Sequence, residues 1–372
     1  MAIAELQQAI EQDPRYGSAY GRLAQAYIRR YVGKRDPIDL ELARRNADLA
    51  LKYGGSNPEV HVACATMFSI VGQSRDAFNE LEQALKLDPG NTEALLLKAR
   101  TLTEMNRPSE AEATFSRVIS LRPNFAQAYN LFGEFYYNRA DYPNAERMLH
   151  LAIACTPRFE RAYSNLGGVY LATKRYDEAD ACFRKAIEIH PSAIAYSNAG
   201  TQMFLREQYA RAVPLMEKAV EIDPRTHTLW RNLGDTYAMV PALQPKAAGA
   251  WQRAAETALA ELRVRPSDAN LLTSLALYHA HLRHQGQALD YLEQARTILN
   301  TDVNVAFKRA QALALLGRTS EALTAVEALW RRGFSMDQIV KAPELNSLRH
   351  TARYNKILAD IHNSQATTQK GN

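Results

Sequence analysis

Prolines recur along this chain of 372 residues at an almost fixed interval. Pro89, Pro123, Pro157 and Pro191 are each 34 residues apart, and Pro224 follows 33 residues later. Because proline starts or stops helices, these positions mark regular boundaries between elements. A fixed period of this length indicates one supersecondary unit repeated along the chain, and it constrains the fold more than any other feature of the sequence.

The segment between two of these prolines, residues 160–191, contains two helical stripes. Its first half places small and apolar residues at Tyr163, Leu166, Gly167 and Tyr170. Its second half does the same at Ala179, Phe183 and Ala186. Spacings of three and four residues are typical of a helix that buries one face. Each repeat is therefore predicted to be two antiparallel helices, here called helix A and helix B, joined by a polar turn.

Small residues recur at one position of each predicted helix. On helix A they are Ala24, Ala65, Ala99, Gly133, Gly167, Gly200, Gly234, Ala276 and Ala310. On helix B they are Ala2, Ala77, Ala111, Ala145, Ala179, Ala212, Ala288 and Ala322. Two helices that cross closely need small side chains at the crossing. We expect these positions to be core packing and not a functional site.

The pattern resembles the tetratricopeptide-repeat (TPR) consensus from Ala2 to about Leu329. The resemblance implies an all-α fold, a right-handed superhelical solenoid of stacked helix pairs with a C-terminal helical cap. The expected domains are a TPR array at 2–329, capping helices at 330–362 and a disordered tail at 363–372. Within the array we expect a partial first repeat at 2–16, about nine further repeats, and irregular insertions near 31–36 and 238–249.

Besides the insertion near 31–36, the regular pattern is interrupted at the start of the chain and near Pro241. The chain begins with residues that match a helix B without a helix A before it, so we expect the natural protein to extend further N-terminally. Near residue 241, Pro241 and Pro245 exclude a tight turn, and we expect the least regular connection of the array there. The following helix B is predicted over Ala247–Arg265, about two turns longer than its relatives.

After Trp330 a short apolar stripe lies on otherwise polar predicted helices, as a solenoid needs to close its last open face. This segment resembles the terminal cap of TPR regions in large bacterial signalling proteins, such as those fused to serine/threonine kinases, nucleotide cyclases or transcription regulators. The resemblance implies an alternative function, the regulatory region of a larger signalling protein.

Composition and motifs argue against several other functions. The net charge of +5 comes from 45 basic and 40 acidic residues that are intermixed, which disfavours a nucleic-acid partner. No apolar run is long enough to span a bilayer. The chain has no glycine-rich phosphate loop, GxSxG or HExxH motif, so we expect no enzymatic activity and no cofactor. We expect a cytoplasmic protein of unspecified oligomeric state.

Neither the cysteines nor a histidine cluster indicates a metal site. Cys64, Cys155 and Cys182 form no CxxC pair, and we expect apolar core side chains. His279, His281 and His284 cluster near the end of a helix A, but offsets of two and five residues do not place all three on one face. No metal ligand is predicted.

A partner-binding surface is predicted on helix A, which lines the concave side of a TPR superhelix. Asn165, Asn198 and Asn232 share one helix-A position, and this arrangement is similar to the asparagine ladder of O-GlcNAc transferase. An amide both donates and accepts hydrogen bonds, which suits capture of peptide main chain. Arg161 and Arg231 occupy neighbouring helix-A positions and favour acidic partners. The alternative, that these asparagines are simply solvated, stays open.

Glu134 and Asp235 complete the predicted binding residues. They occupy the helix-A position at which some TPR co-chaperones place an asparagine that clamps a C-terminal carboxylate. No asparagine occurs at that position in this chain, so such a clamp is not expected. The predicted function is a protein–protein interaction scaffold that binds a partner protein or an extended peptide on the concave helix-A face.

Overall fold

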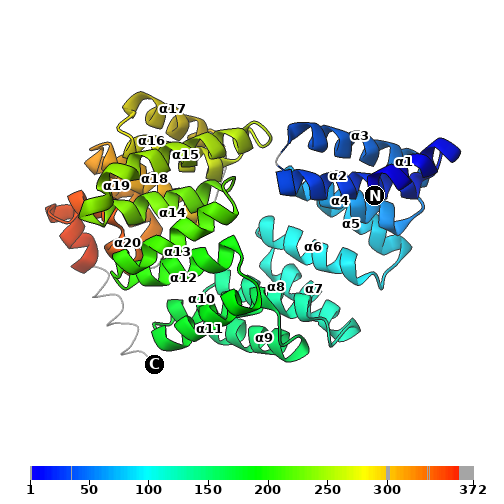
Figure 1. Cartoon of the computed structure of the whole chain (residues 1–372), viewed down its shortest axis with the longest axis horizontal. Coiled ribbons are helices and arrows are strands. Elements are labelled where there is room, and N and C mark those ends of the chain that lie inside the picture. The colour runs from blue at the N-terminus through cyan, green and yellow to red at the C-terminus, as the bar shows by residue number, and fades with distance from the viewer. Residues whose placement is uncertain (1, 35, 299–301, 333, 335, 360–372) are drawn as a thin grey trace. The chain divides into compact units, whose positions relative to one another are not determined.

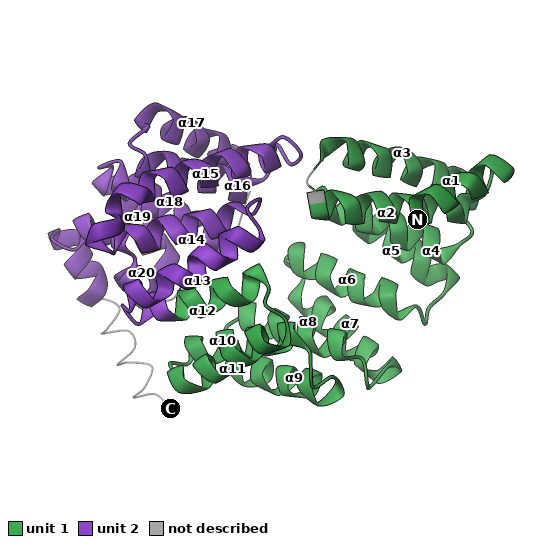
Figure 2. Ribbon diagram, viewed as in Figure 1, with its two compact units in different colours: residues 1–202 green, residues 203–372 purple. Residues whose placement is uncertain are grey.

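The computed structural model of the chain describes residues 2–34, 36–298, 302–332, 334 and 336–359. These residues form helices and connecting turns, with no β-strand among them (Figure 1). The chain divides into two compact units, residues 1–202 (unit 1) and residues 203–372 (unit 2) (Figure 2). The all-α architecture of stacked antiparallel helix pairs predicted from the sequence is confirmed.

Through the repeats, even-numbered helices are helix A and odd-numbered helices are helix B. The helices that begin in unit 1 are α1 (Ala2–Gln12), α2 (Gly17–Lys34), α3 (Pro37–Gly54), α4 (Pro58–Ile70), α5 (Ser74–Leu87), α6 (Thr92–Glu104), α7 (Pro108–Leu121), α8 (Ala126–Asn138), α9 (Tyr142–Cys155), α10 (Glu160–Ala172), α11 (Tyr176–Ile189) and α12 (Ala193–Leu205). Those of unit 2 are α13 (Tyr209–Ile222), α14 (His227–Ala238), η1 (Pro241–Leu243), α15 (Gln244–Leu262), α16 (Ala269–His281), α17 (Gln285–Arg296), α18 (Val303–Leu315), α19 (Thr319–Arg331), α20 (Met336–Lys341) and η2 (Pro343–Leu348). A last helix covers residues 352–359.

The small helix-A position lies where each helix A crosses its own helix B, as the sequence predicts. A Cβ atom added to Gly167 would lie 2.6 Å from Cε1 of Phe183, a distance that real Cβ contacts do not show. At Gly133 the same atom would lie 2.7 Å from Cγ of Leu149. The alanines at this position in other repeats are fully buried. The glycines therefore allow a large helix-B side chain to sit directly against the helix-A backbone.

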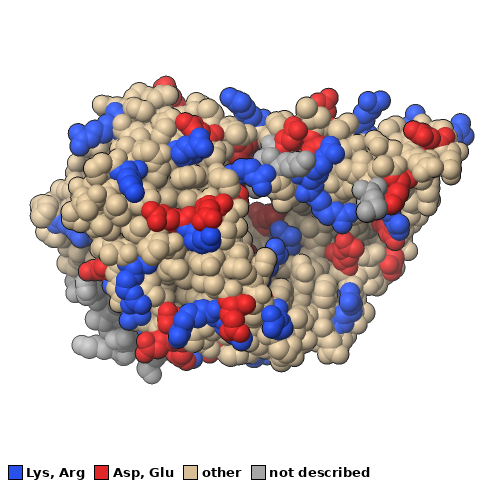
Figure 3. All heavy atoms as spheres, in the orientation of Figure 1, with Lys and Arg blue, Asp and Glu red and all other residues tan. Residues whose placement is uncertain are grey.

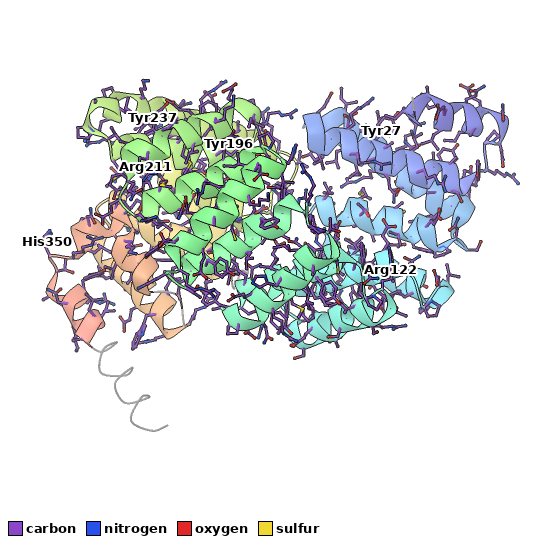
Figure 4. All side chains as sticks on the ribbon, turned by 60° about the horizontal axis from the view of Figure 1, so that its bottom comes forward. Tyr27, Arg122, Tyr196, Arg211, Tyr237 and His350 are labelled. Atoms are coloured by element: carbon purple, nitrogen blue, oxygen red, sulfur yellow. The ribbon has the colours of Figure 1, made fainter. Side chains whose placement is uncertain are left out.

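Tyrosines on helix A join neighbouring repeats through hydrogen bonds to the preceding helix B. The pairs, with the distance between polar atoms, are Tyr27 with Gln7 (3.4 Å), Tyr136 with Glu112 (2.8 Å), Tyr170 with His150 (3.2 Å) and Tyr237 with Glu217 (2.7 Å). Tyr27 on α2 and Tyr237 on α14 are labelled in Figure 4. Each ring is buried while its hydroxyl reaches a polar partner, so one residue contributes both packing and register.

The turn from helix A to helix B uses one left-handed residue, seven positions after the small residue. These residues are Gly72, Asn106, Ala140, Lys174, Glu207, Arg283 and Gly317, with φ between 55° and 76°. At Lys174 the amide donates to the carbonyl of Leu171, and the next amide, of Arg175, donates to Tyr170. This pair of bonds is a Schellman motif, which satisfies the last carbonyls of the helix.

The connection after α14 departs from this turn, as predicted. Its seventh position is Pro241, whose ring holds φ near −65° and which has no amide hydrogen, so the left-handed turn cannot form. The chain instead makes the short 3₁₀ helix η1 and enters α15 directly, with Pro245 in the first turn. The predicted bounds of this helix B, Ala247–Arg265, were wrong by three residues at each end. At 19 residues, α15 exceeds the 14-residue α11 by about one and a half turns.

The insertion in the first repeat makes its helices longer than those of most other repeats: α2 and α3 have 18 residues each. Gly17 and Gly54 let the start of one approach the end of the other, since a Cβ on Gly17 would collide with the Gly54 backbone. Asp36 caps α3 by accepting a hydrogen bond from the Ile38 amide at 3.0 Å.

The segment after α19 covers the end of unit 2. Leu345, Leu348 and Tyr354 are buried in one apolar cluster with Leu313 of α18 and Leu329 of α19. The short apolar stripe thus packs as a cap over its described part, and the predicted tail at 363–372 lies outside the described residues. No described helix is both long enough and apolar enough to cross a membrane.

Candidate functional site

Two adjoining pockets follow the helix-A side of unit 1, and together they are called the helix-A groove. The first, about 230 Å³, is lined by residues of α8, α10 and α12 with one aromatic of α11. Its residues are Glu134, Tyr137, Ser164, Asn165, Gly168, Leu171, Phe183, Asn198 and Thr201. The second, about 180 Å³, is lined by α6, α7 and α8 and shares Glu134 with the first. Stacking of successive helices A therefore produces a continuous polar and aromatic wall.

Asn165 and Asn198 lie in the same pocket. Their equivalent positions in successive repeats predict that the two side chains lie near one another. The Asn165 side chain donates from Nδ2 to Oδ1 of Asn130 at 3.0 Å. Asn130 is buried, so this bond fixes the Asn165 amide and leaves its carbonyl oxygen for another donor. The Asn198 side chain has no hydrogen-bond partner within the described part of the chain.

Asn130 is a residue that the sequence analysis missed. It lies three residues before the small residue of its repeat, whereas Asn165, Asn198 and Asn232 lie two residues before theirs. Matching equivalent positions therefore excludes it. The sequence shows only an asparagine one residue out of register on the neighbouring repeat. Whether it contacts Asn165 depends on how far the two side chains reach, which the spacing of positions does not give.

The other predicted binding residues are distributed over both units. Glu134 is exposed where the two pockets of the groove adjoin, and Arg161 is exposed on the first turn of α10. Asn232, Arg231 and Asp235 belong to α14 in unit 2. Basic and acidic side chains are intermingled on the visible face of each unit, without a large patch of one sign (Figure 3).

Arg231 and Asp235 lie at the base of a second cavity, of about 430 Å³, which is called the unit 2 cavity. Aromatic residues form much of its wall, namely Phe204, Trp251, Phe307 and Phe334. The Arg231 guanidinium nitrogen Nε lies 2.7 Å from Oδ2 of Asp235. Burial opposes the charge of Arg231, but the nearby acidic groups, Asp235 first and then Glu344, together prevail and raise the pKa of the guanidinium. This arginine is therefore committed to an internal ion pair.

Two residues that the sequence analysis did not connect with Asp235 complete this base. Nε2 of His281, at the end of α16, lies 3.9 Å from Oδ1 of Asp235 and 3.5 Å from Oε1 of Glu344, in η2. Gln311 donates from Nε2 to Oε2 of Glu344 at 3.0 Å. Burial opposes ionisation of Glu344, but contact with His281 and the charge of Arg231 prevail and lower its pKa to about 2.

Lys308 of α18 also lines the cavity, where burial and the nearby Arg231 lower its pKa to about 8. Its ammonium donates to Oδ1 of Asn270 at 2.6 Å and to Oγ of Ser274 at 2.8 Å. His279 and His284 lie elsewhere, with their Nδ1 atoms 3.3 Å apart. The structure thus separates His281 from the two histidines beside it in sequence.

The comparisons with known proteins concern the fold. Residues 71–134 and residues 158–225 each match a tetratricopeptide-repeat family model. A tetratricopeptide repeat protein from Parabacteroides merdae is 20% identical, with a TM-score of 0.50 over 63% of this chain and 93% of that one. The human IFIT1 dimer with PPP-AAAA is 16% identical, with a TM-score of 0.53 over 79% of this chain and 77% of that one.

No curated protein sequence matches the chain at a significant level. At identities of 16–20% the likeness to the solved structures concerns the fold alone. The matched family models, the helix pairs and the close crossings at Gly133 and Gly167 lead to the same conclusion. Residues 71–134 and 158–225 match tetratricopeptide repeats, and the described helices stack in pairs with the fold of a helical solenoid.

Proposed function

We propose that the chain is a protein-interaction scaffold whose helix-A groove in unit 1 binds an extended segment of a partner protein. One observation carries the proposal: the amides of Asn165 and Asn198 line one pocket, on successive helices A. Carbonyl and N–H groups recur along an extended peptide, and a side-chain amide can pair with either. The hydrogen bond from Asn165 to Asn130 orients the first amide before a peptide arrives.

The affinity of this groove for main chain alone is modest. One net hydrogen bond contributes about 0.5–1.5 kcal/mol, so two amides supply about 1–3 kcal/mol. Further contacts come from Tyr137, a residue that is 38% exposed, and from the charged side chains of Glu134 and Arg100. Arg231 is held by Asp235, so a preference for acidic partners would rest on Arg100 and Arg161 instead.

The alternative, a regulatory region of a larger signalling protein, has no specific observation in its favour. Interaction through a groove is compatible with such a role, but the capping segment after α19 serves equally well to close a free-standing array. The scaffold function is therefore the conclusion that the geometry supports best, and it includes no enzymatic step.

The test begins with phage-displayed random peptides selected on the purified intact chain. Affinities of the selected peptides are then measured by fluorescence anisotropy for the wild type and for the double variant Asn165→Ala/Asn198→Ala. We expect the double variant to weaken binding about 5- to 150-fold, which corresponds to the loss of two hydrogen bonds. Asn79→Ala is the matched control, because Asn79 is exposed on the helix B α5.

Thermal unfolding of each variant accompanies the binding data. Weaker binding with only a small decrease in melting temperature, as loss of the bond to the buried Asn130 implies, supports the groove. Equal affinity of the double variant and the Asn79→Ala control would place the peptide site elsewhere. A large loss of stability in the double variant would make these asparagines structural and would also contradict the proposal.

A further inference from the structure

The base of the unit 2 cavity contains a buried imidazole nitrogen without a hydrogen-bond partner. His281 has a side chain that is 9% exposed, and its Nε2 atom forms no hydrogen bond with any described residue. A buried polar atom in this state costs roughly 1–3 kcal/mol unless something else satisfies it. Nε2 faces Oε1 of Glu344 at 3.5 Å and Oδ1 of Asp235 at 3.9 Å.

These three atoms have the spacing of ligands around one small cation. They lie within 4.8 Å of one another. Zinc binds nitrogen and carboxylate oxygen at about 2.1 Å, so two ligands of a tetrahedral zinc ion lie about 3.4 Å apart. The contact of His281 with Glu344 already has this length, and that with Asp235 exceeds it by about half an ångström. The two carboxylates, whose ligand atoms lie at most 4.8 Å apart, would rotate towards the imidazole to close around the ion.

Neighbouring donors hold each carboxylate with one oxygen towards His281. Arg231 pairs with Oδ2 of Asp235 at 2.7 Å, and Gln311 donates to Oε2 of Glu344 at 3.0 Å. The Trp251 ring stacks on the imidazole, with 4.2 Å between ring centres, and its Nε1 donates to Oδ1 of Asp235 at 2.9 Å. Supporting hydrogen bonds of this kind orient the ligands in metal sites. The hydrogen bond from Trp251 occupies one lone pair of Oδ1 and leaves the other lone pair able to coordinate a cation.

We propose that Asp235, His281 and Glu344 bind a zinc-class divalent cation, with its fourth coordination position open to the unit 2 cavity. One nitrogen and two oxygens form a ligand set that zinc accepts, and three protein ligands leave room for water or an added anionic group. Arg231, the two carboxylates and a neutral His281 sum to −1, so the buried site attracts a dication. No metal was expected from the sequence, because its three clustered histidines do not share one helix face, and the ligands proposed here come from three separate elements of the chain.

A bound ion would also join the cap to the array, since its ligands come from α14, α16 and η2. The competing arrangement is a protonated His281 between the two carboxylates, which makes the same four charges sum to zero without a metal. The two arrangements differ in their response to zinc, because the protonated imidazole has no lone pair to offer.

The test is isothermal titration calorimetry of the chelator-treated full chain with zinc chloride at pH 7.5. We expect one zinc per chain and a rise in melting temperature on loading. His281→Ala and the isosteric Glu344→Gln should each weaken zinc binding at least tenfold. His284→Ala is the matched control, because His284 is an exposed histidine three residues away and should leave zinc binding unchanged.

Cobalt(II) provides a second readout that does not depend on stability. If the site is tetrahedral, cobalt loading of the wild type gives visible d–d absorption, and His281→Ala loses it. No zinc heat in the wild type, or equal zinc affinity in His281→Ala and His284→Ala, would overturn the proposal and support the protonated imidazole. Peptide binding in unit 1 is measured separately, so failure of either proposal leaves the other intact.

Discussion

At the scale of single residues, the fold depends on which glycine of a helix faces its partner helix. Gly167 and Gly168 are adjacent on α10, yet a Cβ would lie 2.6 Å from the Phe183 ring at the first and 3.9 Å from Tyr137 at the second. The 3.6-residue period turns the two positions to different sides of the helix. Added side chains at these two neighbouring residues should therefore have different consequences for stability.

We expect Gly167→Leu to lower the free energy of unfolding by about 1–3 kcal/mol or more, since the added side chain enters the crossing of α10 and α11. Gly168→Ala should instead raise it by about 0.5–1 kcal/mol, because alanine has the higher helix propensity and its Cβ meets no close neighbour. Urea unfolding followed by circular dichroism measures both. Equal stability of Gly167→Leu and the wild type would show that the helices do not cross there.

The three cysteines differ in burial, and this predicts their reactivity. Cys64 is fully buried, and burial raises its pKa to about 12. Burial likewise raises the pKa of Cys182 to about 11. Because the thiolate is the reacting form, both buried cysteines should react slowly at neutral pH. Cys155 is partly exposed at the end of α9.

We expect one fast-reacting thiol per chain in native buffer and three after denaturation. A maleimide dye followed by peptide mapping should label Cys155 first, and Cys155→Ser should remove the fast phase. Rapid labelling of Cys64 in the folded chain would contradict the burial of α4 against α3.

At the scale of elements, the repeated turn from helix A to helix B depends on one left-handed residue. Ala140 takes this role between α8 and α9 with φ of 57°, and its amide donates to the carbonyl of Tyr137 at 2.9 Å. A left-handed conformation costs a non-glycine residue roughly 1–2 kcal/mol. The same position after α14 is Pro241, and there the chain forms η1 instead.

Substitution of Ala140 tests whether the turn needs a left-handed residue, because removing the single methyl group of alanine changes few other contacts. Ala140→Gly should raise the free energy of unfolding by about 0.5–1 kcal/mol, because glycine adopts positive φ without steric cost. Ala140→Pro should lower it by about 3 kcal/mol or more, since proline excludes positive φ and removes the amide donor. If Ala140→Pro is as stable as the wild type, the left-handed turn is not the connection between α8 and α9.

At the scale of the whole chain, the sequence was sufficient to predict the structural features that depend on neighbouring helices. The 34-residue period, the crossings at Gly133 and Gly167 and the irregular turn at Pro241 all depend on contacts between neighbouring helices, which a helical spacing encodes directly. Boundaries were less secure, as α15 shows, because a proline in the first turn of a helix and one that follows a helix look alike in sequence.

The sites were less predictable than the fold. Asn165 and Asn198 share a pocket because equivalent positions on stacked helices are adjacent, but Asn130 joins them through side-chain reach from an unequal position. The base of the unit 2 cavity combines Asp235 of a regular helix A with Glu344, which is far away in sequence and lies outside the regular pattern. No period relates them, so only the folded chain shows that they meet.

The central claim, that the helix-A groove binds an extended peptide, is tested most directly by photo-crosslinking. A selected peptide that carries a benzophenone side chain is irradiated with the intact chain, and the linked residues are identified by mass spectrometry. We predict crosslinks to groove residues such as Tyr137, Gly168 and Thr201. Crosslinks concentrated instead on exposed helix-B residues, such as Arg147 of α9 and Arg184 of α11, would contradict the claim.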